Sequence, residues 1–208
     1  MIPVRPSKII GIGRNYAAHA RELGNEVPDA PILFFKPHSS LIGPGATIRL
    51  PHVSRQVEFE GEIGVVVGSR LAGADEAAAE RGIAGYVCVN DVTCRDLQKQ
   101  DGQWGRSKGF DTFCPVGPEV RGGLDWRTLE VICRVNGVER QRAPATDMQF
   151  SIPFLLSFLS GIMTLEPGDL IATGTPAGTG QLHDGDVVEV EIPGVGILSN
   201  PVRDGDRR

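Results

Sequence analysis

Hydrophobic residues along the chain occur mostly in short runs separated by glycine and proline, a pattern typical of a sheet-rich protein. The clearest strand pattern covers residues 56–68, where polar and apolar residues alternate before the sequence becomes continuously apolar. Further strands are predicted at residues 8–12, 85–90, 129–135, 139–141, 169–173, 187–192 and 197–202. Asn136-Gly137 lies between two of them and is typical of a type I′ hairpin turn.

Helices are predicted where a capping residue precedes, or a glycine follows, a helical pattern. They cover residues 16–23, residues 74–81 and the segment from Ser151 to about residue 163. Asn15 is placed to cap the first helix, and Gly24 and Gly82 follow the first and second. Because strands outnumber helices without regular alternation, we predict a single α+β domain over residues 1–208. The charged residues 203–208 are expected to be disordered.

Composition and charge exclude several classes of protein. Lysine and arginine number 21 against 26 aspartate and glutamate residues, and the net charge of −5 argues against a duplex nucleic-acid binder and a polybasic membrane anchor. The longest mostly apolar stretch, residues 152–163, is too short to span a membrane, and no signal peptide is visible. Four widely spaced cysteines favour reduced thiols over a zinc site or disulfides. We therefore expect a cytoplasmic protein.

Two glycine-rich segments are similar to nucleotide-binding motifs but lack their defining residues. Gly11-Ile12-Gly13 follows a predicted strand, yet Tyr16 occupies the third glycine position of a dinucleotide fingerprint. Residues 173–180 lack the lysine of a phosphate-binding loop. This second segment is either a tight turn only or a turn whose hydroxyl and N–H groups bind a carboxylate, and the sequence leaves both interpretations open.

Carboxylates gather at the ends of two predicted strands. Alternation along residues 56–68 puts Glu58, Glu60 and Glu62 on one face of the strand. The strand becomes apolar after Glu62, and a second apolar strand ends at Asp91. Carboxylates placed in this way either form a solvated face or bind a hard divalent cation such as Mg²⁺, Mn²⁺ or Ca²⁺. The spacing alone does not decide between these two interpretations.

His19 and Glu22 are three residues apart on the first predicted helix and therefore share one of its faces. A carboxylate that holds an imidazole makes it a better general base for activating water. The same spacing also occurs by coincidence on exposed helices, so it does not by itself identify a catalytic pair.

Motifs along nearly the whole chain resemble the fumarylacetoacetate hydrolase superfamily, specifically its single-domain branch of acylpyruvases and oxaloacetate decarboxylases. The matching segments follow the family's order and spacing. They are residues 11–24 (GIGRNYAAHARELG), 34–37 (FFKP), 58–68 (EFEGEIGVVVG), 85–98 (GYVCVNDVTCRDLQ), 107–118 (SKGFDTFCPVGP), 135–141 (VNGVERQ) and 150–180, followed by the last hairpin. The resemblance implies a β-rich fold of mixed sheets and a homodimer.

The resemblance also implies roles for the residues at matching positions. A catalytic Mg²⁺ or Mn²⁺ is expected on Glu60, Glu62 and Asp91, with Glu58 as an accessory acid, and Ca²⁺ is also compatible with oxygen ligands. A small 2-oxo acid is expected to contact Arg95, Gln98, Lys108 and Thr175, where Lys108 also adds positive charge beside the reacting enolate. Water activation is expected from His19 and Glu22, carried by a helix that closes over the substrate.

Three functions are consistent with this resemblance. The first is a metal-dependent hydrolase or lyase that cleaves a C–C bond of a 2,4-dioxo acid (acylpyruvate or fumarylpyruvate) or decarboxylates oxaloacetate through a metal-stabilised enolate. The second is an isomerase or decarboxylase of hydroxymuconate- or hydroxyheptadienedioate-type diacids in aromatic catabolism. The third is a non-catalytic binder of small carboxylates. Residues 25–50 and 100–125, where the distal wall of the pocket is expected, do not identify the substrate.

Overall fold

The computed structural model describes residues 3–22 and 24–205. Within these residues the strands form three sheets with both parallel and antiparallel pairs, which confirms the expected α+β class with mixed sheets. The largest sheet has seven strands in the order β2-β1-β12-β6-β7-β9-β3. Its strands are β1 (Ile9–Gly13), β2 (Ile32–Lys36), β3 (Leu41–Ile42), β6 (Gly61–Val67), β7 (Ile83–Asn90), β9 (Cys114–Arg121) and β12 (Leu170–Ala172).

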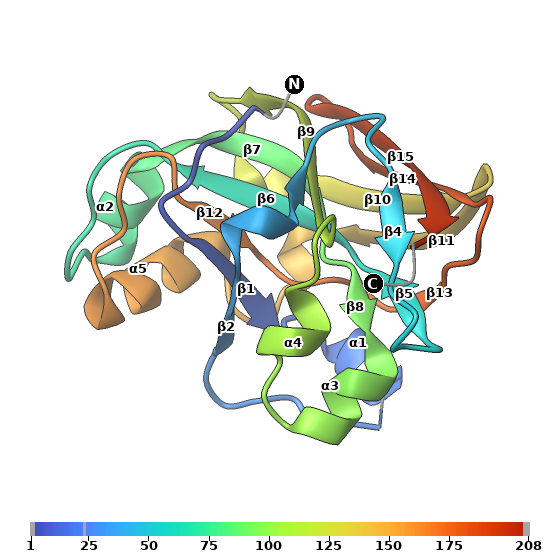
Figure 1. Cartoon of the computed structure of the whole chain (residues 1–208). Coiled ribbons are helices and arrows are strands. Elements are labelled where there is room, and N and C mark those ends of the chain that lie inside the picture. The colour runs from blue at the N-terminus through green and yellow to red at the C-terminus, as the bar shows by residue number, and fades with distance from the viewer. Residues whose placement is uncertain (1–2, 23, 206–208) are drawn as a thin grey trace.

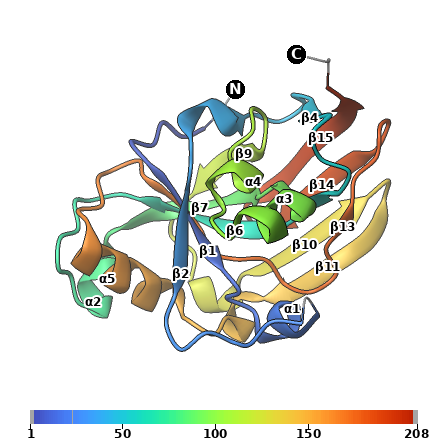
Figure 2. The same ribbon diagram turned by 60° about the horizontal axis from the view of Figure 1, so that its bottom comes forward.

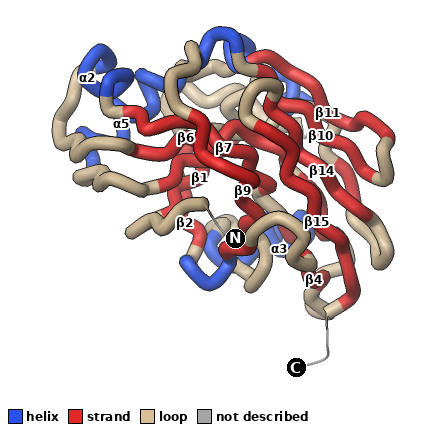
Figure 3. The backbone as a smooth tube through the Cα atoms, turned by 90° about the horizontal axis from the view of Figure 1, so that it is seen from above, coloured by secondary structure: helices blue, strands red, loops and turns tan. Residues whose placement is uncertain are grey.

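The second sheet has the order β11-β10-β14-β15-β4, and the third has the order β13-β5-β8. Their strands are β4 (Ile48–Leu50), β5 (Val57–Phe59), β8 (Thr93–Cys94), β10 (Glu130–Val135), β11 (Val138–Pro144), β13 (Gly180–Gln181), β14 (Val187–Ile192) and β15 (Gly196–Asp204). Figure 3 shows the strands of the two larger sheets next to each other. They share one apolar core, to which β6 contributes Ile63, β10 contributes Cys133 and β14 contributes Val190.

The helices are short and lie outside the sheets in two groups (Figure 1). At one end, α2 (Glu76–Arg81) packs against α5 (Ile152–Ile162). At the other end lie α1 (Ala17–Glu22), α3 (Arg95–Asp101) and α4 (Gly105–Lys108), and Figure 2 shows α3 and α4 in front of β6 and β7. Single 3₁₀ turns are found at His38–Ser40, Trp126–Thr128 and Ala145–Asp147. None of the helices among the described residues has the length and apolar character needed to cross a membrane.

The local patterns explain why several elements form where they were predicted. Ser151 caps α5 by accepting a hydrogen bond from the N–H of Phe154 (3.3 Å), as the sequence indicates. Asn136 and Gly137 both have positive φ angles (53° and 76°), which is the conformation of the predicted type I′ turn between β10 and β11. The hairpin of β14 and β15 is also present as predicted.

The predicted strand over residues 56–68 is divided at Glu60. Its first part is β5 in the three-stranded sheet, and its second part is β6 in the seven-stranded sheet. At the break, the N–H of Glu60 donates to the side chain of Asn90 (3.0 Å), and the N–H of Asp91 donates to the carbonyl of Glu60 (2.8 Å). Glu60 therefore lies at the junction of two sheets instead of inside one continuous strand.

Asn15 does not cap the first helix as expected. Its side chain accepts a hydrogen bond from the N–H of Phe150 (2.8 Å) and donates to the carbonyls of Phe150 (3.1 Å) and Thr173 (2.8 Å). These long-range contacts join the segment after β1 to the chain before α5 and after β12, and they use the side-chain groups that a cap would need. The last residue of the predicted helix, Leu23, lies outside the described residues.

Two further differences from the predicted elements occur. The polar segment after Asp91, for which no helix is predicted, forms α3 and α4. The expected C-terminal disorder is wrong for residues 203 and 204, because they continue β15 and pair with Arg49 and Leu50 of β4. Residues 206–208 of that predicted tail lie outside the described residues.

Replacing Asn15 with alanine is expected to lower the free energy of unfolding by about 3 kcal/mol, because it leaves one buried N–H and two buried carbonyl groups without their hydrogen bonds. Urea unfolding followed by fluorescence would measure the loss. Gln100→Ala, at an exposed position of α3, is the matched control and is expected to change stability by less than about 0.5 kcal/mol. A loss below about 1 kcal/mol for Asn15→Ala would show that these contacts do not hold the fold together.

Candidate metal centre and active-site cavity

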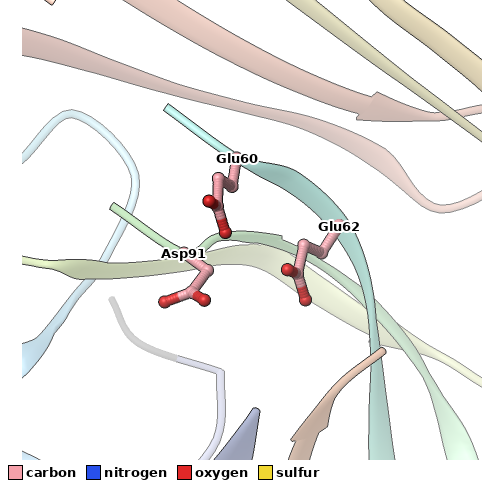
Figure 4. Close-up of side chains that lie close together, drawn as sticks. All are labelled: Glu60, Glu62 and Asp91. Atoms are coloured by element: carbon pink, nitrogen blue, oxygen red, sulfur yellow. The ribbon is translucent and has the colours of Figure 1, made fainter. Parts of the chain in front are cut away.

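Three buried carboxylates converge where β6 and β7 meet (Figure 4). Glu60 connects β5 to β6, Glu62 lies on β6, and Asp91 follows the last residue of β7. The antiparallel pairing sets Gly61 opposite Asn90, which brings the ends of the two strands together. One oxygen atom of each carboxylate lies within 4.8 Å of the others. The structure thus brings together the three residues that the sequence indicates as metal ligands.

Two buried lysines contact these carboxylates. Lys108 donates hydrogen bonds to Glu60 (2.6 Å) and Asp91 (2.5 Å). Burial lowers the pKa of Lys108, but the adjacent Asp91 and Glu60 outweigh this effect and raise it above its ordinary value, so the side chain stays cationic. Lys36 donates to the other oxygen of Asp91 (2.5 Å) and to the backbone carbonyl of Lys108 (2.5 Å). Asp91 is therefore held between two ammonium groups.

Arg95 begins α3 and holds two acids from the divided strand. Its Nε donates to Glu58 (2.8 Å), its Nη2 donates to Glu60 (2.5 Å), and its Nη1 donates to the side-chain oxygen of Gln98 (2.6 Å). Burial by itself raises the pKa of Glu60, but the charges of Lys108 and Arg95 bring it below its ordinary value. Glu60 is therefore ionised and fixed in orientation, and Glu58 is held on the far side of the guanidinium group.

Glu62 differs from the other carboxylates because no lysine or arginine among residues 3–22 and 24–205 pairs with it. It accepts one hydrogen bond from the N–H of Gly174 (2.9 Å). Burial, together with the charges of Asp91 and Glu60, raises the pKa of Glu62 well above its ordinary value. A divalent cation would supply the missing positive charge, and carboxylate oxygens are the ligands that Mg²⁺ and Mn²⁺ prefer. The donor set therefore fits such an ion.

The segment after β12 forms one wall beside Glu62. The hydroxyl of Thr175 donates to the carbonyl of Gly61 (2.9 Å) and accepts a hydrogen bond from Nε2 of Gln141 (2.7 Å). Gln141 also accepts from the N–H of Gly61 (3.0 Å) and donates to the carbonyl of Pro176 (2.7 Å). Because the hydroxyl proton of Thr175 is committed to Gly61, its backbone N–H is the better candidate donor to a substrate carboxylate.

His19 and Glu22 lie on α1 and face each other across one turn. Nδ1 of His19 lies 3.3 Å from a carboxylate oxygen of Glu22, whose two oxygens also accept hydrogen bonds from the N–H of Gly178 (3.0 and 3.1 Å). His19 is buried, whereas Glu22 is exposed. With Nδ1–H donated to Glu22, Nε2 carries the lone pair that a general base needs. The same carboxylate links α1 to the segment that carries Thr175.

One cavity of about 410 Å³ joins these groups, a size suited to a small substrate. Of the predicted site residues, its walls include His19, Glu60, Glu62, Arg95, Gln98, Lys108 and Thr175. The remaining lining residues are Ile12, Gly13, Arg14, Asn25, Lys99, Gly102 and Trp104. Asp91 and Glu22 adjoin the cavity through their contacts with Lys108 and His19.

Sequence reasoning missed two buried residues that hold the site together, Lys36 and Gln141. Their partners lie far away in the sequence: Lys36 contacts Asp91 across 55 residues, and Gln141 contacts Gly61 across 80. Lys36 ends a strand of otherwise apolar character, and a polar residue at such a position is the one indication the sequence offers. It does not identify the partner. Gln141 lies between two arginine residues in a polar strand and has no such indication.

Comparison with known proteins agrees with this geometry. Residues 8–203 match the family model described as "Fumarylacetoacetate (FAA) hydrolase C-terminal". The chain is 41% identical over 208 residues to "Oxaloacetate tautomerase FAHD1, mitochondrial" of Arabidopsis thaliana, covering 97% of this chain and 92% of the relative. It is 40% identical over 195 residues to "Oxaloacetate decarboxylase, mitochondrial" of Dictyostelium discoideum, covering 90% and 89%.

A solved structure extends the similarity to three dimensions. The crystal structure of 5-carboxymethyl-2-hydroxymuconate delta-isomerase from Mycobacterium smegmatis matches with a TM-score of 0.93 and 44% sequence identity. The match covers 99% of this chain and 82% of that chain. The architecture described above is therefore shared with relatives of different named activities.

Proposed function

The chain belongs to the fumarylacetoacetate hydrolase family of enzymes, and we propose that it is a Mg²⁺- or Mn²⁺-dependent enzyme that acts on oxaloacetate, or a related small 2-oxo acid, through its enolate. The observation that carries the proposal is the buried cluster of Glu60, Glu62 and Asp91, in which Glu62 has no cationic partner among the described residues. Relatives named for oxaloacetate tautomerisation and decarboxylation support the choice of oxaloacetate.

The side chains around the cluster suit an enolate that forms in the cavity. A divalent cation bound there would act as a Lewis acid for the negative charge that develops on the substrate. Lys108, which stays protonated, would add a second positive charge. Arg95 holds Gln98 toward the cavity. The N–H of Thr175 would orient the substrate carboxylate. Because these groups are buried, their electrostatic effect on the substrate is stronger than it would be in water.

A second reaction, hydrolysis of the C–C bond of an acylpyruvate or fumarylpyruvate, is favoured by a separate observation. The His19–Glu22 pair places a candidate general base in the cavity wall, and hydrolysis requires an activated water molecule. Decarboxylation and tautomerisation of oxaloacetate do not consume water. Isomerisation of hydroxymuconate-type diacids, the activity named for the Mycobacterium smegmatis neighbour, remains the alternative to both.

The proposed function is tested by a substrate panel with the purified protein. Decay of the enol absorbance of oxaloacetate reports tautomerisation, coupled lactate dehydrogenase reports pyruvate, and acylpyruvates and fumarylpyruvate report hydrolysis. Each assay is run with Mg²⁺, with Mn²⁺ and with a chelator, and a metal-only control corrects for uncatalysed decarboxylation. Metal-dependent turnover supports the proposal. Tight oxalate or pyruvate binding without turnover of any compound would show a carboxylate binder instead. Light scattering tests the proposed homodimer on the same sample.

His19→Ala is expected to lower the turnover of acylpyruvate hydrolysis by roughly 100-fold or more, because the water loses its general base. Oxaloacetate turnover is expected to fall much less, by under roughly 10-fold, because that reaction has no water to activate. Steady-state kinetics with both substrates would measure the two effects. Glu22→Gln, which keeps the size of the residue that contacts Nδ1, should show the same bias to a smaller extent. Equal losses on both substrates would contradict a water-activating role.

A further inference from the structure

Two cations in the cavity wall have no acidic partner within the part of the chain that the structure describes. Arg95 and Lys108 are neutralised by carboxylates, as described above. Arg14 and Lys99 also line the cavity, yet no carboxylate of residues 3–22 or 24–205 forms an ion pair with either. Uncompensated positive charge on the wall of a substrate cavity is a favourable environment for an anion.

Lys99 lies on the face of α3 that lines the cavity. Arg95, Gln98, Lys99 and Gly102 line the cavity at the spacing i, i+3, i+4, i+7, which puts them on one side of the helical path. The helix rises 1.5 Å per residue, so the backbone of Lys99 lies about 6 Å further along the axis than that of Arg95. Arg95 contacts the acids of the metal centre, and Lys99 is exposed. The face therefore leads from the metal centre toward the cavity mouth.

Arg14 also lines the cavity and is held there by its backbone and by an aromatic ring. Its φ angle is 56°, a left-handed conformation that a non-glycine residue adopts only at an energetic cost. Its guanidinium carbon lies 6.0 Å from the centre of the Trp104 ring. That ring lies against Gly13, where a Cβ atom would come within 2.3 Å of it. The ring of Trp104 also packs on Phe34 with a centroid distance of 5.4 Å.

We propose that Arg14, assisted by Lys99, binds the second carboxylate of a 2-oxo dicarboxylic acid whose 2-oxo acid end lies at the metal centre. The inference rests on the proposed function for the position of that first end. A planar guanidinium group with free donors matches a carboxylate, and the ring of Trp104 limits the orientations that Arg14 can adopt. The same contacts stabilise a carboxylate that decarboxylation would expel. For oxaloacetate they therefore favour keto–enol conversion over loss of CO₂.

Calorimetric binding tests the subsite without relying on turnover. The ligands are 2-oxoglutarate, a stable 2-oxo diacid, and 2-oxopentanoate, which has the same chain length without the distal carboxylate; both are titrated into the full chain with Mn²⁺. The wild-type protein is expected to bind the diacid roughly 10- to 100-fold more tightly. Arg14→Gln is expected to remove most of this preference. Lys99→Gln is expected to reduce the preference only by roughly threefold, because Lys99 is exposed.

Two further variants keep the test decisive. Arg14→Lys retains the charge without the guanidinium fork and should restore part of the preference. Arg70→Gln removes the same charge from an exposed pair with Glu166 and should leave the preference at the wild-type value. The inference is overturned if the wild-type protein shows no preference for the diacid, or if Arg14→Gln weakens both ligands equally. If the wild-type protein prefers the diacid and Arg14→Gln removes that preference, the subsite is supported even when the protein does not turn over oxaloacetate. The binding test and the test of the proposed reaction can therefore fail independently.

Discussion

Replacing Glu62 with glutamine is expected to weaken Mn²⁺ binding by at least roughly 100-fold and to lower metal-dependent turnover by roughly 1000-fold, without loss of stability. Glutamine keeps the shape of the side chain and can still accept the hydrogen bond from Gly174. The substitution removes a negative charge that is disfavoured by burial and by the nearby negative charges of Asp91 and Glu60. The metal-free variant should therefore unfold at a temperature equal to or higher than that of the wild-type protein.

Titration calorimetry with Mn²⁺ and thermal unfolding in a chelator would measure these two effects separately. The matched control is Gln56→Ala, which removes an amide that contacts Glu58 and lies outside the three-carboxylate cluster. This variant should retain Mn²⁺ affinity within roughly threefold. If Glu62→Gln bound Mn²⁺ as tightly as the wild-type protein, Glu62 would not be a ligand. If it were strongly destabilised without metal, its charge would have a structural role that its contacts do not indicate.

Lys108→Met is expected to slow catalysis strongly while metal binding persists. The ammonium group lies between Glu60 and Asp91, so its loss removes positive charge from the reacting centre and is expected to lower turnover by roughly 100- to 1000-fold. It also removes a cation that repels the metal, so Mn²⁺ should bind at least as tightly as in the wild-type protein. The opposite effects of this variant and Glu62→Gln on Mn²⁺ affinity distinguish a charge-supplying residue from a ligand.

Stability provides the second measurement on Lys108→Met. Without metal, two buried carboxylates lose a partner, so the variant should unfold at a lower temperature than the wild-type protein. Saturating Mn²⁺ should restore most of the difference, because binding to the folded state stabilises it. Weak Mn²⁺ binding together with an unfolding temperature that metal does not raise would contradict this account of Lys108.

The meeting of Glu60, Glu62 and Asp91 follows only in part from local rules. Alternation puts Glu60 and Glu62 on one side of their segment, and the apolar runs that follow Glu62 and precede Asp91 mark the ends of strands. That these two strands, β6 and β7, pair with each other is a property of the tertiary fold, in which they are neighbours in the seven-stranded sheet. The family resemblance, and not the hydrophobic pattern, supplied that adjacency.

The remaining parts of the site could not be read from local pattern, for physical reasons. The division at Glu60 arises because Asn90 takes the N–H of Glu60, a contact between distant residues. The helices α3 and α4 contain few apolar residues, and no side chain caps either one, so the usual sequence indications are missing. Asn15 illustrates the reverse case, because a favourable capping residue is used for contacts with Phe150 and Thr173.

The location of a bound Mn²⁺ would show directly whether the three carboxylates form a metal centre. Crystals of the full chain grown with Mn²⁺, and measured at a wavelength where manganese scatters anomalously, would show the ion as a peak in the anomalous difference map. We expect one peak among the carboxylates of Glu60, Glu62 and Asp91, and no peak there in crystals of Glu62→Gln prepared in the same way. A peak elsewhere, or none at this cluster at saturating Mn²⁺, would contradict this expectation.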